Sequence, residues 1–255
     1  MYFEDVQSCF VKYLESRKIF KVKEFDNTIK HKDISLDNIK EQMFIISEFH
    51  RRTLKYSGIM NKRLYNNIGK EVEQYKVYTK KFKKYLDRIG KIQNKTIFQK
   101  KLNQIGKKYL IRAKSCMDNL HKNDYTDLII RSMKREEMCL INTYFSNLRK
   151  KRNIEVIDIE GCCYNMVEMD AVYFLNKIKR KGINVDFYEI IMEFCKYEHL
   201  KHSSEQFILS MISYPYEFMK CCSKYIYGTK NWTEKEYILQ LSKAMDQDGE
   251  SLIKS

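Results

Sequence analysis

The fold is decided by residues 141–162, which read INTYFSNLRKKRNIEVIDIEGC. Two short apolar runs, 140–148 and 154–159, are separated in this part of the chain by a polar turn at 149–153. Such alternation is typical of a β hairpin, whereas most of the chain has the three- and four-residue spacing of helices. The sequence therefore predicts one small hairpin inside a mainly α-helical protein.

The composition narrows the class of protein. A chain of 255 residues with 44% hydrophobic residues is long enough for one large or two small domains with a buried core. One proline and eight glycines argue against a turn-dense all-β fold. No run approaches the roughly 20 apolar residues that span a bilayer, and the acidic start MYFEDV is unlike a secretory signal. We expect a cytosolic protein without a membrane span.

Eight cysteines occur, and four of them form the adjacent pairs at 162–163 and 221–222. Adjacent cysteines rarely bind one metal ion together, and the sequence has no C-x-x-C motif. We therefore interpret the cysteines as small buried apolar residues of a reducing compartment.

The positive charge is concentrated in residues 51–115, which contain 20 Lys and Arg residues against 3 Asp and Glu residues. The rest of the chain contains 28 against 30, so this block accounts for the whole net charge of +15. Its apolar stripes predict a basic helical pair at about 70–121. Two interpretations stay open, namely a solvated surface and a weak docking site for an anionic partner such as nucleic acid. The lysines expected to meet that partner are Lys80, Lys81, Lys83 and Lys84.

The C-terminal part, 168–250, has helical stripes throughout. The segment NWTEKEY at 231–237 predicts a helix start, because Thr233 and Glu236 have the spacing of a capping box. Trp232 and Tyr237 then occupy the two positions of a hydrophobic staple.

Four segments resemble one family. They are ISEFH at 46–50, VIDIEGC at 156–162, EMDAV at 168–172 and KNWTEKE at 230–236. Together they are similar to the CotS-type spore coat proteins, relatives of aminoglycoside phosphotransferases and choline kinases. The resemblance implies that the hairpin, 139–162, corresponds to a catalytic loop.

In that family an Asp accepts the proton of the substrate hydroxyl, and an Asn and a later Asp hold magnesium on the nucleotide phosphates. The resemblance places Asn142 at the position of the base, and a neutral amide cannot accept a proton at neutral pH. It places Asn147 and Asp158 at the positions that bind metal and nucleotide. Asp170 matches the residue that steadies the loop, although it also suits an ordinary helix start. His50 suits a core or loop-bonding histidine.

The N-terminal part departs from the family. The first glycine is Gly58, so the glycine-rich loop that covers nucleotide phosphates is missing before Ile46. Residues 1–45 are expected to be a truncated, mostly helical segment, with at most one strand remnant at 19–25. Residues 46–255 would form the helical lobe of a kinase-like phosphotransferase, with the N-terminal lobe largely missing.

These observations lead to the expectation of a non-catalytic spore coat protein with no cofactor, whose partners are other coat proteins. A residual small-molecule phosphotransferase that uses ATP and magnesium is one alternative. A module that binds a polyanion through residues 51–115 is another. If a second chain supplies the missing N-terminal lobe, the argument that catalysis has been lost no longer holds. His199, His202 and Glu198 have the spacing of metal ligands but lack an obvious further ligand.

Overall fold

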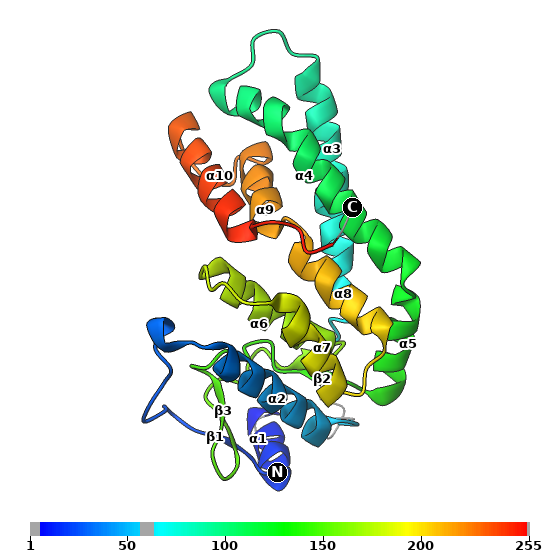
Figure 1. The fold of residues 1–255 in the computed structure, drawn as a ribbon, viewed down its shortest axis with the longest axis vertical. Coiled ribbons are helices and arrows are strands. Elements are labelled where there is room, and N and C mark those ends of the chain that lie inside the picture. The colour runs from blue at the N-terminus through cyan, green and yellow to red at the C-terminus, as the bar shows by residue number, and fades with distance from the viewer. Residues whose placement is uncertain (1–5, 57–63, 254–255) are drawn as a thin grey trace. The chain divides into compact units, whose positions relative to one another are not determined.

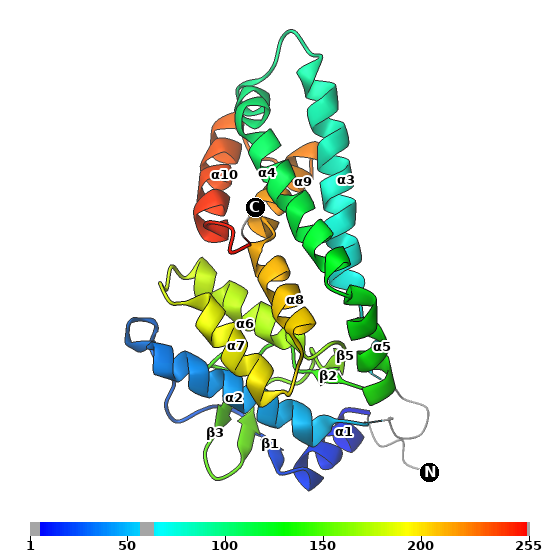
Figure 2. The same ribbon diagram turned by 45° about the vertical axis from the view of Figure 1, so that its right-hand side comes forward.

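The computed structural model describes residues 6–56 and 64–253. The chain forms two compact units, each assembled from several segments. We call the first the loop unit; it consists of residues 1–69, 124–177 and 185–208. We call the second the basic unit; it consists of residues 70–123, 178–184 and 209–255. Figures 1 and 2 show the elements of both units.

Helices make up most of the loop unit. They are α1 (Val6–Ser16), the short helix η1 (His31–Asp33), α2 (Leu36–Thr53), α5 (Tyr125–Arg135), α7 (Phe187–Tyr197) and the first parts of α6 (Glu168–Arg180) and α8 (His202–Ser213). Helix α2 begins where Ser35 and Asn38 form a reciprocal capping box. Its buried side carries Ile39, Met43 and Phe49, and it lies against α7, to which Lys40 of α2 is joined by an ion pair with Glu189.

Two small sheets complete the loop unit. In the first, strand β4 (Ile154–Val156) lies between β1 (Ile19–Lys21) and β3 (Leu148–Lys150). β3 and β4 are antiparallel and form the predicted hairpin, whereas β1 is parallel to β4. The second sheet pairs β2 (Met138–Cys139) with β5 (Cys163–Tyr164). Residues 140–147, between β2 and β3, form a loop and not the first arm of the hairpin.

The basic unit is a helical bundle. It contains α3 (Lys70–Gly90), α4 (Ile97–Lys122), α9 (Tyr216–Ile226), α10 (Glu234–Asp248) and the last parts of α6 and α8. Helices α3 and α4 lie side by side, joined by a short turn (Figure 2). Gly106 permits this close approach, since a Cβ atom at that position would lie 2.7 Å from Leu86 Cδ2. The core is rich in aromatic rings, among them Tyr75 stacked on Tyr214.

The prediction of a mainly α-helical protein with a small hairpin is confirmed. The basic helical pair appears as α3 and α4, and the expected strand remnant appears as β1. Thr233 and Glu236 form the predicted capping box, and the Trp232 and Tyr237 rings lie 5.2 Å apart. The absence of an N-terminal lobe is not confirmed and stays a prediction.

Two further observations concern the described residues as a whole. Seven of the eight cysteines are buried, as predicted, and Cys9 is partly exposed. None of the described helices combines the length and the apolar character that crossing a membrane requires.

Candidate active site

The 140–147 loop starts with a tight turn whose backbone N–H groups are bound by one carboxylate. Asp170, near the start of α6, accepts hydrogen bonds from the backbone N–H groups of Leu140 and Ile141 at 2.8 and 2.7 Å. The next N–H, that of Asn142, donates to the Leu140 carbonyl at 2.9 Å, and φ of Ile141 is 70°. This is a γ-turn with a positive φ, a strained conformation for a β-branched residue. The turn leaves the Asn142 side chain exposed.

Asn147 joins the end of this loop to the strand that follows. Its Nδ2 donates to the carbonyls of Asn142 and Asp158 at 2.7 and 2.9 Å, and its Oδ1 accepts from the Asp158 N–H at 2.7 Å. Asn147 is buried, whereas the Asp158 carboxylate is exposed. One Asp158 oxygen accepts from the Glu160 N–H at 2.8 Å and fixes the turn after β4. Asn147 therefore connects the two exposed side chains, Asn142 and Asp158, through their backbones.

Helix α2 fixes the middle of the loop. The buried Gln42 amide donates to the carbonyls of Thr143 and Leu148 at 2.8 and 3.0 Å. The Thr143 hydroxyl donates in turn to the Asp170 carbonyl at 3.4 Å. Loop backbone groups that would otherwise be buried without partners are thus satisfied by side chains of α2 and α6.

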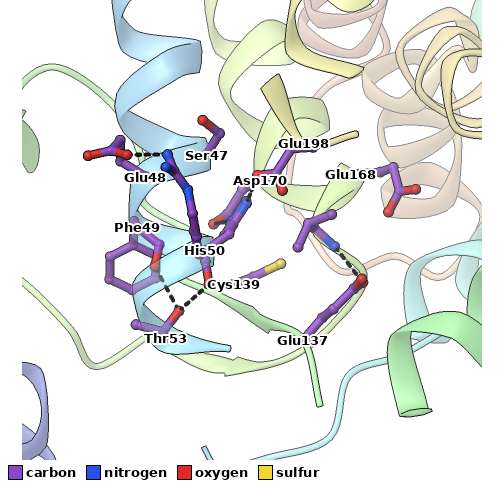
Figure 3. A network of polar contacts seen from close by, with 12 residues as sticks. Ser47, Glu48, Phe49, His50, Thr53, Glu137, Cys139, Glu168, Asp170 and Glu198 are labelled. Atoms are coloured by element: carbon purple, nitrogen blue, oxygen red, sulfur yellow. Dashed lines mark hydrogen bonds and ion pairs between the residues drawn. The ribbon is translucent and has the colours of Figure 1, made fainter. Parts of the chain in front are cut away.

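His50 lies beneath Asp170 and is sandwiched between two carboxylates (Figure 3). Its Nε2 lies 2.9 Å from Asp170 Oδ2, and its Nδ1 lies 2.6 Å from Glu198 Oε1. Burial alone would lower the pKa of His50, but Glu198 and Asp170 outweigh it and raise the pKa to about 10. His50 is therefore a buried imidazolium at neutral pH, and it stabilises the Asp170 carboxylate that holds the turn.

His50, Cys139 and Asp170 have ligand atoms within 4.8 Å of one another. A metal ion does not fit this group, because a protonated His50 has no lone pair to offer. The Cys139 thiol donates to the Met166 carbonyl, and burial raises its pKa well above the ordinary range. Both groups would have to lose a proton before a metal could bind.

A second buried ionic group supports the strand that leads into the loop. The Arg131 guanidinium of α5 donates to both oxygens of Glu137 at 3.1 Å and to both oxygens of Glu168 at 2.7–2.8 Å. Both carboxylates are completely buried, and Arg131 keeps the pKa of Glu168 below its ordinary value against the opposing effect of burial. Arg131 thereby joins α5 and α6 to the start of β2.

The structure brings together most of the residues that the sequence singled out. Asn142, Asn147 and Asp158 lie at one loop, Asp170 holds it as the resemblance implies, and His50 is the expected loop-supporting histidine. Glu198 serves as the partner of His50, and His202 pairs with Glu205, so the predicted spacing of metal ligands does not form a site. The roles of Gln42 and Arg131 were missed. The partners of Gln42 lie 101 and 106 positions away, and Arg131 is joined to Glu168, 37 positions away, as well as to the nearby Glu137.

No family model and no curated protein matches the chain. Among solved structures, it is similar to the crystal structure of an aminoglycoside phosphotransferase from Alicyclobacillus acidocaldarius subsp. acidocaldarius DSM 446. The TM-score is 0.66 at 10% sequence identity, and the match covers 90% of this chain and 67% of the other. At this identity the likeness establishes the fold, which is that of a kinase-like phosphotransferase.

This likeness contradicts the prediction that the chain is not an enzyme. The structural neighbour is an enzyme, and nine-tenths of this chain follows its fold. The prediction depended on a missing nucleotide lid and on Asn142 in place of a base. Phosphoryl transfer depends mostly on positioning and electrostatic stabilisation, so an amide at that position is no ground for excluding the reaction. The CotS-type assignment is not confirmed.

Proposed function

We propose that this protein is a phosphotransferase that takes a phosphoryl group from ATP, bound with a divalent cation at Asp158, and transfers it to a hydroxyl group of a small molecule. The observation that carries the proposal is the anchoring of the 140–147 loop. Buried side chains of Asp170, Asn147 and Gln42 hold its backbone, while the side chains of Asn142, within the loop, and Asp158, after β4, stay exposed. Asn147 is bonded to the backbones of both residues. The turn that leads into Asn142 is strained at Ile141, and such strain clusters at functional sites.

The donor atoms fit magnesium. The exposed Asp158 carboxylate is a hard oxygen ligand, and one of its oxygens accepts no hydrogen bond from the described residues. Asn147 Oδ1 already accepts from the Asp158 N–H, so Asn147 would first of all orient Asp158. A magnesium ion at this position would neutralise charge on the nucleotide phosphates.

The expected rate of phosphoryl transfer depends on Asn142, which occupies the position of the general base. Its amide can orient an acceptor hydroxyl by hydrogen bonding but cannot remove the proton. A general base contributes roughly 100- to 10,000-fold to such reactions. We therefore expect slow transfer, driven by positioning at the anchored loop.

Calorimetric or thermal-shift titration of the full chain with ATP and magnesium tests the proposal. ATP at 100 times its dissociation constant should add about 2.7 kcal/mol of stability, a shift of several degrees. The shift should need magnesium and should be lost in Asp158→Asn. Glu160→Gln is the matched control, since it removes a neighbouring exposed carboxylate and leaves the Glu160 N–H in place. Equal shifts in wild type and Asp158→Asn, or no shift in wild type, would count against ATP binding at Asp158.

A role in the spore coat, a location there and coat proteins as partners remain predictions from the family resemblance. Co-isolation of this chain with coat components from spores is the measurement that checks them. Failure to detect the chain in purified coats would remove this prediction and leave the phosphotransferase proposal unaffected.

A further inference from the structure

The two units differ in net charge. The loop unit contains 23 Lys and Arg residues and 23 Asp and Glu residues, whereas the basic unit contains 25 and 10. The basic unit therefore carries the entire net charge of +15. A surplus of this size produces a positive field that attracts anions.

Regularly spaced lysines line the outer side of α3 and α4. Lys80 and Lys84 are four residues apart on α3, so they project from the same side of that helix. Lys100, Lys107 and Lys114 recur every seven residues on α4, about 10.5 Å apart along its axis. All five are exposed, and none has a carboxylate within ion-pair distance among the described residues. We call these five residues the lysine face.

The four lysines first expected to meet an anion, at positions 80, 81, 83 and 84, do not share one direction. Steps of 100° per residue place Lys81 and Lys83 on opposite flanks of α3. The Lys81 ammonium lies 4.8 Å from the centre of the Tyr227 ring. The partner surface is therefore better described by the lysine face, whose members lie opposite the buried side of α3 or of α4.

The chemistry of the lysine face favours nucleic acid over a membrane or an acidic protein. The apolar stripes of α3 and α4 are buried in the core of the basic unit. Val77, Ile97 and Ile111 are exposed, but Ile97 and Ile111 lie about 21 Å apart along α4 and Val77 is on α3, so neither helix has a continuous apolar side to insert into lipid. The row from Lys100 to Lys114 extends about 21 Å along α4, a length over which a DNA duplex presents roughly 12 phosphates. A regular row of flexible ammonium groups matches a regular row of phosphates. An acidic protein surface offers carboxylates without such a repeat.

We propose that the lysine face binds the phosphate backbone of a nucleic acid without reading its bases. The five residues are all lysines, whose flexible ammonium groups meet phosphates as point charges, and such contacts carry no sequence information. Binding of this kind releases counterions and depends steeply on salt. The inference is independent of the phosphotransferase proposal, since Asp158 lies in the loop unit.

Fluorescence anisotropy with a labelled 30-base-pair duplex of random sequence tests the proposal on the full chain. Five phosphate contacts should weaken binding about 500-fold between 50 and 200 mM salt. The variant Lys80→Glu, Lys84→Glu, Lys107→Glu and Lys114→Glu should lose more than tenfold in affinity and most of the salt dependence. The matching Lys→Gln set should lose less, and circular dichroism checks that both sets fold.

The control variant makes the same change in net charge within the loop unit. It carries Lys23→Glu, Lys30→Glu, Lys32→Glu and Lys201→Glu, four exposed lysines without an ion pair among the described residues. It should keep wild-type affinity, as should Asp158→Asn. Equal losses in the control and lysine-face variants would overturn the proposal, because binding would then follow total charge. Tighter binding to phosphatidylserine vesicles or to polyglutamate than to the duplex would overturn it in favour of a membrane or an acidic protein.

Discussion

The loop unit and the basic unit contain nearly the same number of Lys and Arg residues, 23 and 25. The two units differ in whether these cations have carboxylate partners. In the loop unit, two cations beside buried carboxylates support the loop, since Arg131 lies between Glu137 and Glu168 and His50 lies between Asp170 and Glu198. In the basic unit the lysine face has no such partners among the described residues. Paired charges hold a backbone loop in one unit, and unpaired charges stay available to a partner in the other.

Asp170→Asn should produce the largest effect on stability. It leaves the buried His50 imidazolium with one carboxylate fewer and weakens two backbone hydrogen bonds of the γ-turn. Removing one member of a buried ion pair typically costs about 3–5 kcal/mol. Urea unfolding measures the loss. Asp37→Asn, an exposed acid in the first turn of α2, is the control and should change stability by less than about 0.5 kcal/mol. Similar values for the two variants would contradict the role of Asp170.

The pH dependence of stability should reveal His50. The folded pKa of about 10 exceeds the ordinary value, so its contribution is complete below pH 6.5 and is lost as pH rises to about 10. The loss is at most about 1.4 kcal/mol for each pH unit in that window. Unfolding of wild type and His50→Gln from pH 6 to 10 tests this, and their difference should shrink as pH rises. A constant difference would mean that His50 is neutral in the folded protein.

Lys179 in the basic unit should show the opposite trend. Burial is the main cause that lowers the pKa of Lys179 to about 8, and its ammonium donates to the Ile212 carbonyl at 2.9 Å. The unfolded chain then binds more protons than the folded chain between pH 8 and 10.5, so stability rises with pH in that window. His50 opposes this trend in wild type, but it is also present in the Lys179→Met variant, so its effect cancels in the difference between the two proteins. The stability of wild type relative to Lys179→Met should therefore increase when unfolding is compared at pH 8 and 10. A difference that stays constant over this range would contradict the lowered pKa of Lys179.

Single changes on the lysine face should have the smallest effect. Lys84→Gln removes an exposed charge without an ion pair, so the free energy of unfolding should change by less than about 0.5 kcal/mol. The change should be stabilising at low salt and vanish at high salt, since it relieves repulsion that salt screens. Thermal unfolding at 20 and 500 mM salt measures it. A loss above 1 kcal/mol would show that Lys84 has a structural partner.

Local features of the fold could be predicted from the sequence, because their causes lie within a few residues. The hairpin follows from the polar segment 149–153, but only residues 151–153 connect the strands, since Arg149 and Lys150 belong to β3. The start of α10 follows from Thr233 and Glu236. Helix α5, Tyr125–Arg135, and the short pair of β2 with β5 were not predicted. The first arm of the hairpin was extended too far, since residues 140–147 alternate like a strand but are bonded to Asp170, Asn147 and Gln42.

The candidate site could be predicted only in part. The resemblance placed Asn142, Asn147, Asp158 and Asp170, and the structure gathers them at one loop. Several of the hydrogen bonds that hold the loop and its supports join residues about 30 to 150 positions apart, such as Leu140 to Asp170 and His50 to Glu198, and one sequence contains no signal for such pairs. The prediction that the chain is not an enzyme was wrong, because it gave a missing nucleotide lid and the amide of Asn142 more weight than the fold, which is similar to that of an aminoglycoside phosphotransferase.

The most direct test of the central claim, that the anchored loop supports phosphoryl transfer, is the Asn142→Asp variant. Phosphate release or transfer from γ-labelled ATP with magnesium, with an aminoglycoside as a trial acceptor, would be compared in wild type, Asn142→Asp and Asn142→Asp with Asp158→Asn. The account predicts slow turnover in wild type and at least a tenfold rise on restoring a carboxylate, within the range of general-base catalysis. The rise should be abolished by Asp158→Asn. No turnover in either wild type or Asn142→Asp, with both folded, would contradict the account.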